Sequence, residues 1–106
     1  MSYRVLTALA AERDIIAAAD HIEHALKNPS AADRLLDHVE RRFASLSELP
    51  RRTRVVGDPV LSSWGIHCIA VDNYLAFYVV DDEGKTVTVV RFLHQKSNWS
   101  QILRLG

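Results

Sequence analysis

Apolar residues recur every three or four positions in the first half of the chain, which is the spacing of one helix face. This pattern predicts a first helix over residues 8–27, capped by Thr7, and a second over residues 30–49, capped by Ser30. The Asn-Pro pair between them ends the first helix, because a residue that precedes proline disfavours helical backbone. Since the link is so short, we expect the two helices to form an antiparallel hairpin.

The second half has the short apolar runs and turn residues of β-strands. The predicted strands are residues 66–71, 74–80 and 86–93, with turns at Asp72-Asn73 and residues 82–85. Residues 3–6 predict an edge strand, residues 50–65 an irregular segment, and Ser97 the cap of a short C-terminal helix. The pattern therefore predicts an α+β fold of order β-α-α-β-β-β. Its twisted antiparallel sheet packs on the helical hairpin, with the other face partly open.

Length and composition point to one packed domain over residues 1–106. A chain of this size buries about two-thirds of its unfolded surface, and its 48% apolar content is enough for a core. No segment has the length and apolarity of a membrane span, and the start does not resemble a signal peptide. The single Cys68 forms no internal disulfide and falls in an apolar strand pattern, so we expect a core residue and a reduced, cytoplasmic setting.

Charge is balanced overall but uneven along the chain. Residues 1–40 and 57–90 are acidic, whereas residues 41–56 and 91–106 are basic. The basic residues of these two segments are Arg41, Arg42, Arg51, Arg52, Arg54, Arg91, Lys96 and Arg104. Two interpretations remain open: a local anionic partner, or solvated arginines that flank a loop.

Four segments, taken in order, carry a family resemblance. They are the opening YRV strand, the A-x-x-D start at Ala11–Asp14, the PSAADRLLDHVERRFASLSELP helix and the NYLAFYVVDDEGKTVTVVRFLHQKSNW hairpin. Together they resemble the RelE/ParE superfamily of toxins from bacterial type II toxin–antitoxin modules. The resemblance implies a microbial-RNase-like sheet, no cofactor, and a cognate antitoxin that wraps the toxin.

The resemblance implies two activities, because the superfamily has two branches. One is similar to ribosome-dependent endoribonucleases that cut messenger RNA without a metal, and this mRNA interferase activity is our first prediction. The other resembles inhibitors of DNA gyrase that are not nucleases. A third alternative is a toxin fold of low potency that serves as an antitoxin-binding module.

Cleavage by the RNA 2′-hydroxyl needs proton transfer and cations for the developing phosphorane charge. The resemblance places a late functional residue near His94, which is the candidate acid or base because histidine titrates near neutrality. The other candidates are Arg91 and Lys96 for catalysis and Arg51, Arg52, Arg54 and His67 for RNA or phosphate binding.

Alternatives stay open for the two central candidates. His94 could instead end its strand by capping a backbone carbonyl, and Arg91 could form an ion pair with an acid from a helix. Two departures from the nuclease pattern weaken the assignment of the catalytic residues: His67 stands where relatives often have arginine, and Leu75 replaces a basic residue. The neutral net charge agrees better with the gyrase alternative.

The remaining aromatic and histidine residues are expected to be structural. Tyr74 and Tyr78 should belong to the core, and Trp99 should pack the terminal helix on the sheet. His21 and His24 have a spacing compatible with a metal, but no third ligand stands nearby, so a solvated helix face is preferred. Trp64 is either an exposed recognition residue or a lid on the core.

Overall fold

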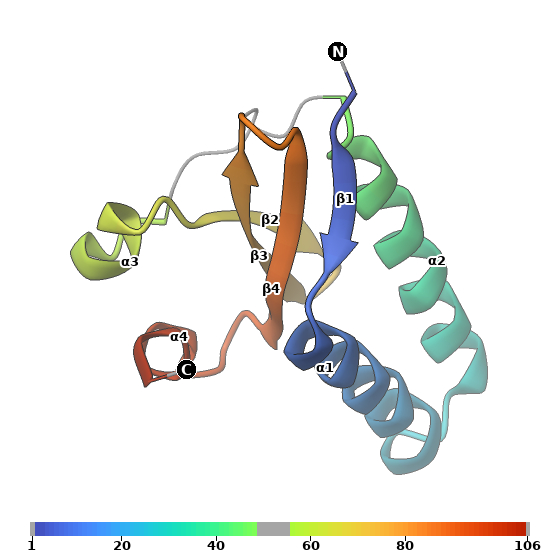
Figure 1. The fold of residues 1–106 in the computed structure, drawn as a ribbon. Helices are drawn as coiled ribbons and strands as arrows, with labels where there is room; N and C mark the ends of the chain where they lie inside the picture. Colours follow the sequence, from blue (N-terminus) through green and yellow to red (C-terminus); the bar gives the residue numbers. More distant parts are fainter. Residues whose placement is uncertain (1, 49–55, 106) are drawn as a thin grey trace.

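The predicted order of helices and strands is present in the computed structural model, which describes residues 2–48 and 56–105 (Figure 1). The elements are β1 (Arg4–Thr7), α1 (Leu9–Asp20), the π-helical turn η1 (His21–Ala25), α2 (Pro29–Ser45), α3 (Pro59–Ser63), β2 (His67–Val71), β3 (Tyr74–Asp81), β4 (Thr86–His94) and α4 (Trp99–Leu105). The α+β prediction is therefore confirmed. The helix α3 is an addition, because the sequence predicted an irregular segment there.

The helical hairpin forms as predicted, but its caps differ. Ala8 precedes α1 with extended backbone and no side-chain cap, and Thr7 is the last residue of β1, so the Thr7 cap was wrong. The helix α2 begins at Pro29, and the Oδ1 atom of Asn28 accepts a 3.1 Å hydrogen bond from the Ala31 amide. Asn28 is therefore the cap in place of Ser30, since proline suits the first helical position and needs a capping residue before it.

The sheet has the strand order β1-β4-β3-β2, with β1 at one edge as expected. The strands β2, β3 and β4 form the predicted antiparallel meander. In contrast, β1 pairs with β4 in parallel, so the sheet is mixed and not antiparallel throughout. A parallel pair needs a long crossover connection, and here the chain between β1 and β4 supplies it through the helical hairpin and the other two strands.

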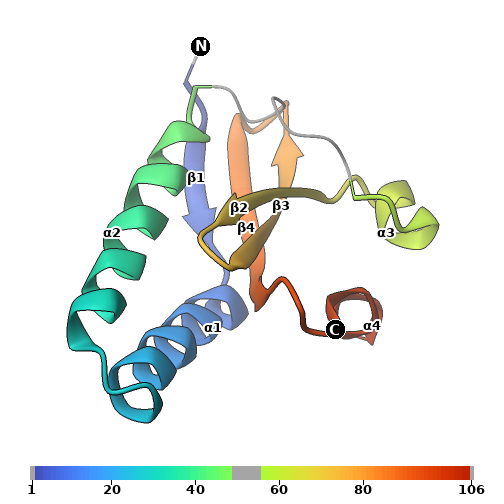
Figure 2. The same cartoon turned by 180° about the vertical axis from the view of Figure 1, so that it is seen from behind.

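Each face of the sheet carries its own apolar cluster. The helices α1 and α2 lie on one side of the sheet, and α3 and α4 lie on the other (Figures 1 and 2). On one face Leu35 and Phe43 of α2 pack with Tyr78 and Val89. On the other face, which we expected to be partly open, α3 and α4 pack against Phe77. The members of this second buried cluster are Val56, Leu61, Ile66, Phe77 and Leu103.

A β-bulge in β4 decides which of its side chains meet which cluster. Phe77 pairs with Arg91 and Tyr78 with Val89, so Val90 has no partner of its own. After this extra residue the faces exchange, and Phe92 joins the helix-side cluster. Simple alternation along residues 86–93 does not reveal this change.

The small helices α3 and α4 are joined through Asp58. This N-cap residue accepts hydrogen bonds from the Val60 and Leu61 amides at 3.0 and 3.1 Å, and the Nη2 atom of Arg104 donates to its Oδ2 at 2.6 Å. Burial alone would raise the pKa of Asp58. The hydrogen bonds from the Leu61 amide and from Arg104 outweigh burial, so the pKa is lowered from 3.8.

We expect the free energy of unfolding of Asp58→Asn to depend less on pH in the acidic range than that of the wild type. A carboxylate whose pKa is lower in the folded state adds stability above its unfolded pKa, and this contribution is lost as the pH falls through the folded value. Asparagine caps a helix as well as aspartate but does not titrate. Urea unfolding between about pH 5 and 2 should therefore show a smaller decrease in the free energy of unfolding for the variant than for the wild type. An equal loss in both proteins would exclude Asp58 as a source of the acid sensitivity.

Candidate functional site

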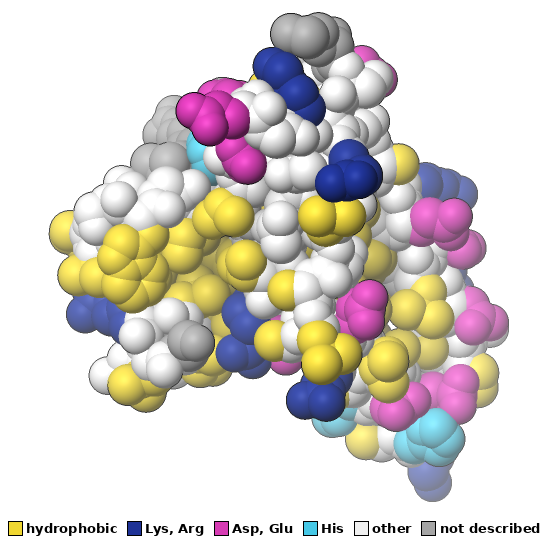
Figure 3. All heavy atoms as spheres, in the orientation of Figure 1, with side chains coloured by type: hydrophobic (Ala, Val, Ile, Leu, Met, Phe, Trp, Pro, Cys, Tyr) yellow, Lys and Arg dark blue, Asp and Glu magenta, His cyan; other side chains and the backbone are white. Residues whose placement is uncertain are grey.

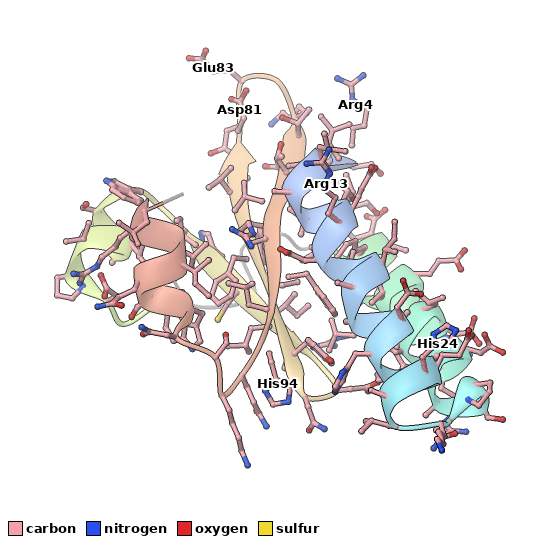
Figure 4. The ribbon with its side chains drawn as sticks, turned by 90° about the horizontal axis from the view of Figure 1, so that it is seen from below. Arg4, Arg13, His24, Asp81, Glu83 and His94 are labelled. Atoms are coloured by element: carbon pink, nitrogen blue, oxygen red, sulfur yellow. The ribbon has the colours of Figure 1, made fainter. Side chains whose placement is uncertain are left out.

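The candidate His94 is the last residue of β4, at the lower end of the sheet in Figure 4. Its ring meets the Tyr74 ring edge-on, with centroids 5.1 Å apart. The Lys96 amide donates a 3.0 Å hydrogen bond to its Nδ1 atom. A ring nitrogen that accepts such a bond carries no proton, so the neutral ring holds its proton on Nε2.

The candidate Arg91 is engaged by an acid from α1, one of the two alternatives that the sequence left open. Its Nε and Nη2 atoms donate to the two carboxylate oxygens of Asp14 at 2.7 and 3.1 Å. The side chains are only 27% and 16% exposed. Hydrogen bonding to Asp14 raises the pKa of Arg91, although burial acts in the opposite direction. The guanidinium is thus already matched to a carboxylate.

Asp14 has a second role at the edge of the sheet. The strand β1 pairs with β4 only as far as Val89, so the lower part of that edge lacks a neighbouring strand. There the Phe92 amide donates to the Oδ2 atom of Asp14 at 3.0 Å. One carboxylate therefore satisfies a strand amide and the Arg91 side chain together.

Among the described residues of the predicted set, His67 does not converge with His94. His67 is buried at 9% exposure, with its ring stacked on Tyr78 at a centroid distance of 5.3 Å. Lys96 is exposed and lies two residues after His94 in the chain. Arg51, Arg52 and Arg54 lie outside the described residues. Of the predicted set, the structure therefore shows only His94 and Lys96 together, and the catalytic roles stay predictions.

Tyr78 and Trp99 pack as expected, whereas Tyr74 and Cys68 are only partly buried against the two apolar clusters. Tyr78 is fully buried, Tyr74 stacks on Phe92 at 5.0 Å, and Trp99 packs on Phe77 at 5.2 Å. Burial raises the pKa of both the Tyr74 hydroxyl and the Cys68 thiol, so neither is activated as an anion.

Trp64 is 52% exposed, which favours a surface residue over a lid on the core. Figure 3 shows apolar side chains gathered over α3 and α4 on this side of the molecule. Val60 and Leu105, from these two helices, are also exposed. The face opposite the helical hairpin is therefore partly apolar at its surface.

A cleft of about 500 Å³ lies between η1, α2 and the β2–β3 turn, with His94 in its wall. The polar and charged side chains that line it are His21, Asn28, Arg34, His38, Asp72, Asn73, Tyr74 and His94. Sequence reasoning missed Arg34 and His38, although their four-residue spacing places both on one side of α2.

The elements around the cleft are held by local contacts. The Leu26 amide donates to the His21 carbonyl at 3.1 Å, a five-residue step that widens the end of the first helix. The Nδ1 atom of His38 lies 2.8 Å from Asp72, which tethers α2 to the β2–β3 turn. His24 lies in η1, away from His94 in Figure 4, and its Nδ1 atom is 3.2 Å from the Asp20 carbonyl oxygen. Within the two described ranges, no three His, Cys, Asp or Glu side chains group as metal ligands.

The family of the chain follows from comparison with known proteins. The model of the ParE toxin family, from the type II toxin–antitoxin system parDE, matches residues 5–99. The chain belongs to the ParE toxin family. The predicted membership of the RelE/ParE superfamily is confirmed. A search of curated protein sequences finds no match for this ParE-family chain.

Solved structures agree with the family. The chromosomal ParDE system of P. aeruginosa has a chain with TM-score 0.70 and 16% identity, which covers 88% of this ParE-family chain and 96% of its own length. A chain of the toxin–antitoxin complex RelBE2 of Mycobacterium tuberculosis has TM-score 0.61 and 25% identity, and the match covers 89% of this chain and 99% of that one. An E. coli RelE mutant in the free state has TM-score 0.64 and 16% identity, and the match covers 99% of this chain and 98% of that one. At such low identity, the first and third show the fold alone.

None of the helices described here combines the length and the apolarity that crossing a membrane requires.

Proposed function

We propose that this ParE-family toxin inhibits DNA gyrase by binding to it, and that it does not cut RNA. The family match supports this choice between the two branches of the superfamily. The neutral net charge supports it as well, because a protein that binds ribosomal RNA needs many phosphate contacts. The geometry at His94 carries the argument.

The hydrogen bond from the Lys96 amide to His94 is hard to reconcile with acid–base catalysis. A general base needs a free nitrogen, but the nitrogen without a proton, Nδ1, already accepts from this amide. A general acid would need the doubly protonated ring, whose Nδ1 proton would point at the same amide hydrogen. In this arrangement His94 shapes the end of β4 and does not transfer protons.

Among the described residues, few of the predicted cationic side chains are available to stabilise the charge of a phosphorane. The charge of Arg91 is matched by Asp14, and His67 is buried beneath the surface. Lys96 is then the exposed cation that remains from the predicted set, apart from the three arginines outside the described residues. An inhibitor that acts by binding needs neither a proton donor nor a phosphorane-stabilising cluster.

We also propose a cognate antitoxin as partner. The similar structures include the RelBE2 toxin–antitoxin complex and E. coli RelE in complex with an antitoxin RelBc peptide. This ParE-family chain has the same fold, so an antitoxin peptide is the partner expected for it. In that setting it acts in the cytoplasm, where gyrase is found.

Expression without the antitoxin tests the proposal. We expect DNA synthesis to stop before protein synthesis, and we expect His94→Ala to arrest growth as fully as the wild type. Loss of a catalytic acid or base lowers a rate by about 10²–10⁴-fold. Immediate loss of protein synthesis that disappears in His94→Ala would support the mRNA endoribonuclease instead. Harmless expression of the folded wild-type chain would support the antitoxin-binding module.

A further inference from the structure

A second hollow adjoins the cleft along α2 and makes one continuous surface. It has a volume of about 290 Å³ and is lined by Arg41 and Arg42 of α2 and by Ala70 and Val71 of β2. His38 and Asp72 belong to the walls of both hollows. The two hollows therefore follow the same side of α2, one after the other.

Basic residues form a stripe on this side of the helix. Arg34, His38 and Arg41 are four and three residues apart, so they share one face, and Arg42 adjoins it. The acids of the same helix have the same spacing but a different phase, which places them on another face. These acids are Asp33, Asp37 and Glu40.

Half of the stripe is free to take a ligand, because His38 and Arg42 already have partners among the described residues. Among the residues that the structure describes, no carboxylate forms an ion pair with Arg34 or Arg41. Asp72, the one acid among the described residues of the walls, is paired with His38. The Nε atom of Arg42 donates to the Ala70 carbonyl at 3.1 Å, which fixes the side chain and leaves its terminal nitrogens available.

The length of the stripe indicates an extended anion. Arg34 and Arg42 are eight residues apart, roughly 12 Å along a helix. A single phosphate does not reach both ends. A nucleic-acid strand carries a phosphate about every 3.4 Å along its axis, so several successive phosphates fit this distance.

We propose that the α2 stripe, with the two hollows beside it, binds the phosphodiester backbone of a nucleic acid. Apolar residues are present in both hollows, with Ile22, Leu26 and Leu35 in the first and only the small residues Ala70 and Val71 in the second, so the run of basic residues along α2 is the feature that favours a nucleic acid over an acidic protein segment. Peptide docking relies on apolar anchors, whereas backbone contacts to phosphate need only cations. This proposal goes beyond gyrase inhibition, because it says that the toxin binds a nucleic acid directly, in the absence of gyrase.

Fluorescence anisotropy with the purified toxin tests this surface. The probes are a labelled 20-base-pair DNA duplex and a labelled 20-nucleotide RNA, titrated at about 50 and 200 mM salt. The variant is Arg34→Gln/Arg41→Gln, and the matched control is Arg13→Gln, an exposed arginine of α1 that lies away from His94 in Figure 4. All three side chains are exposed, and thermal melting confirms folding.

Each lost phosphate contact lowers the salt slope on duplex DNA by about 0.9. The affinity advantage of the wild type over the double variant should therefore shrink about 12-fold between the two salt concentrations, while Arg13→Gln keeps the wild-type slope. Binding to DNA, to RNA or to both identifies which nucleic acid is preferred. Absence of binding at the lower salt, or an unchanged slope in the double variant, overturns the proposal. Equal competition by poly-glutamate overturns it in favour of an acidic protein partner.

Discussion

Asp14→Ala should lower the free energy of unfolding by about 2–4 kcal/mol, because it leaves Arg91 as a largely buried charge without a partner. The Phe92 amide loses its acceptor as well, at a sheet edge that β1 does not reach. For a domain of this size, the loss corresponds to a melting temperature lower by about 10–20 °C. Calorimetry or urea unfolding measures it directly.

The matched control is Asp20→Ala, which removes an exposed acid at the C-terminal end of α1. We expect little change there. A double variant, Asp14→Ala/Arg91→Met, should be less destabilised than the sum of its two single variants, because replacing both partners removes the uncompensated charge. Strict additivity, or an equal loss in Asp20→Ala, would contradict the role assigned to the ion pair.

Phe77→Ala should lower the free energy of unfolding by about 3–5 kcal/mol. The side chain is fully buried, and its ring packs at a tilt against Trp99 in the cluster that holds α3 and α4 on the sheet. The cavity left by alanine removes this contact, whereas Phe77→Leu keeps much of the apolar volume and should lose far less.

A local readout separates this effect from general destabilisation. In a Trp64→Phe background, Trp99 is the remaining tryptophan, so its fluorescence reports on α4 alone. We expect Phe77→Ala to shift its emission to longer wavelength under native conditions, as water reaches the indole. An unchanged spectrum together with a small loss of stability would show that α4 is held by other contacts.

The sequence was sufficient for the helices and strands because their apolar periodicities are long and regular. It was less informative where a single contact decides between neighbouring residues. Both Asn28 and Ser30 are good caps, and the choice of Asn28 depends on a proline at the first helical position. The bulge at Val90 and the parallel pairing of β1 arise from tertiary packing, which no local pattern encodes.

The candidate site was harder to predict than the fold. The pairing of Arg91 with a helical acid was foreseen as one of two alternatives, and the structure shows Asp14 in that position. The contact between His38 and Asp72 joins residues that are 34 positions apart. Only the folded chain brings them together beside His94, so the cleft has no signature in the sequence.

Supercoiling of a relaxed plasmid by purified DNA gyrase tests the central claim most directly. Addition of the toxin should block supercoiling in a dose-dependent manner, and His94→Ala should block it equally. In a parallel reaction with translating ribosomes, the messenger RNA should remain intact. Unchanged supercoiling, together with mRNA cleavage that is lost in His94→Ala, would contradict the account.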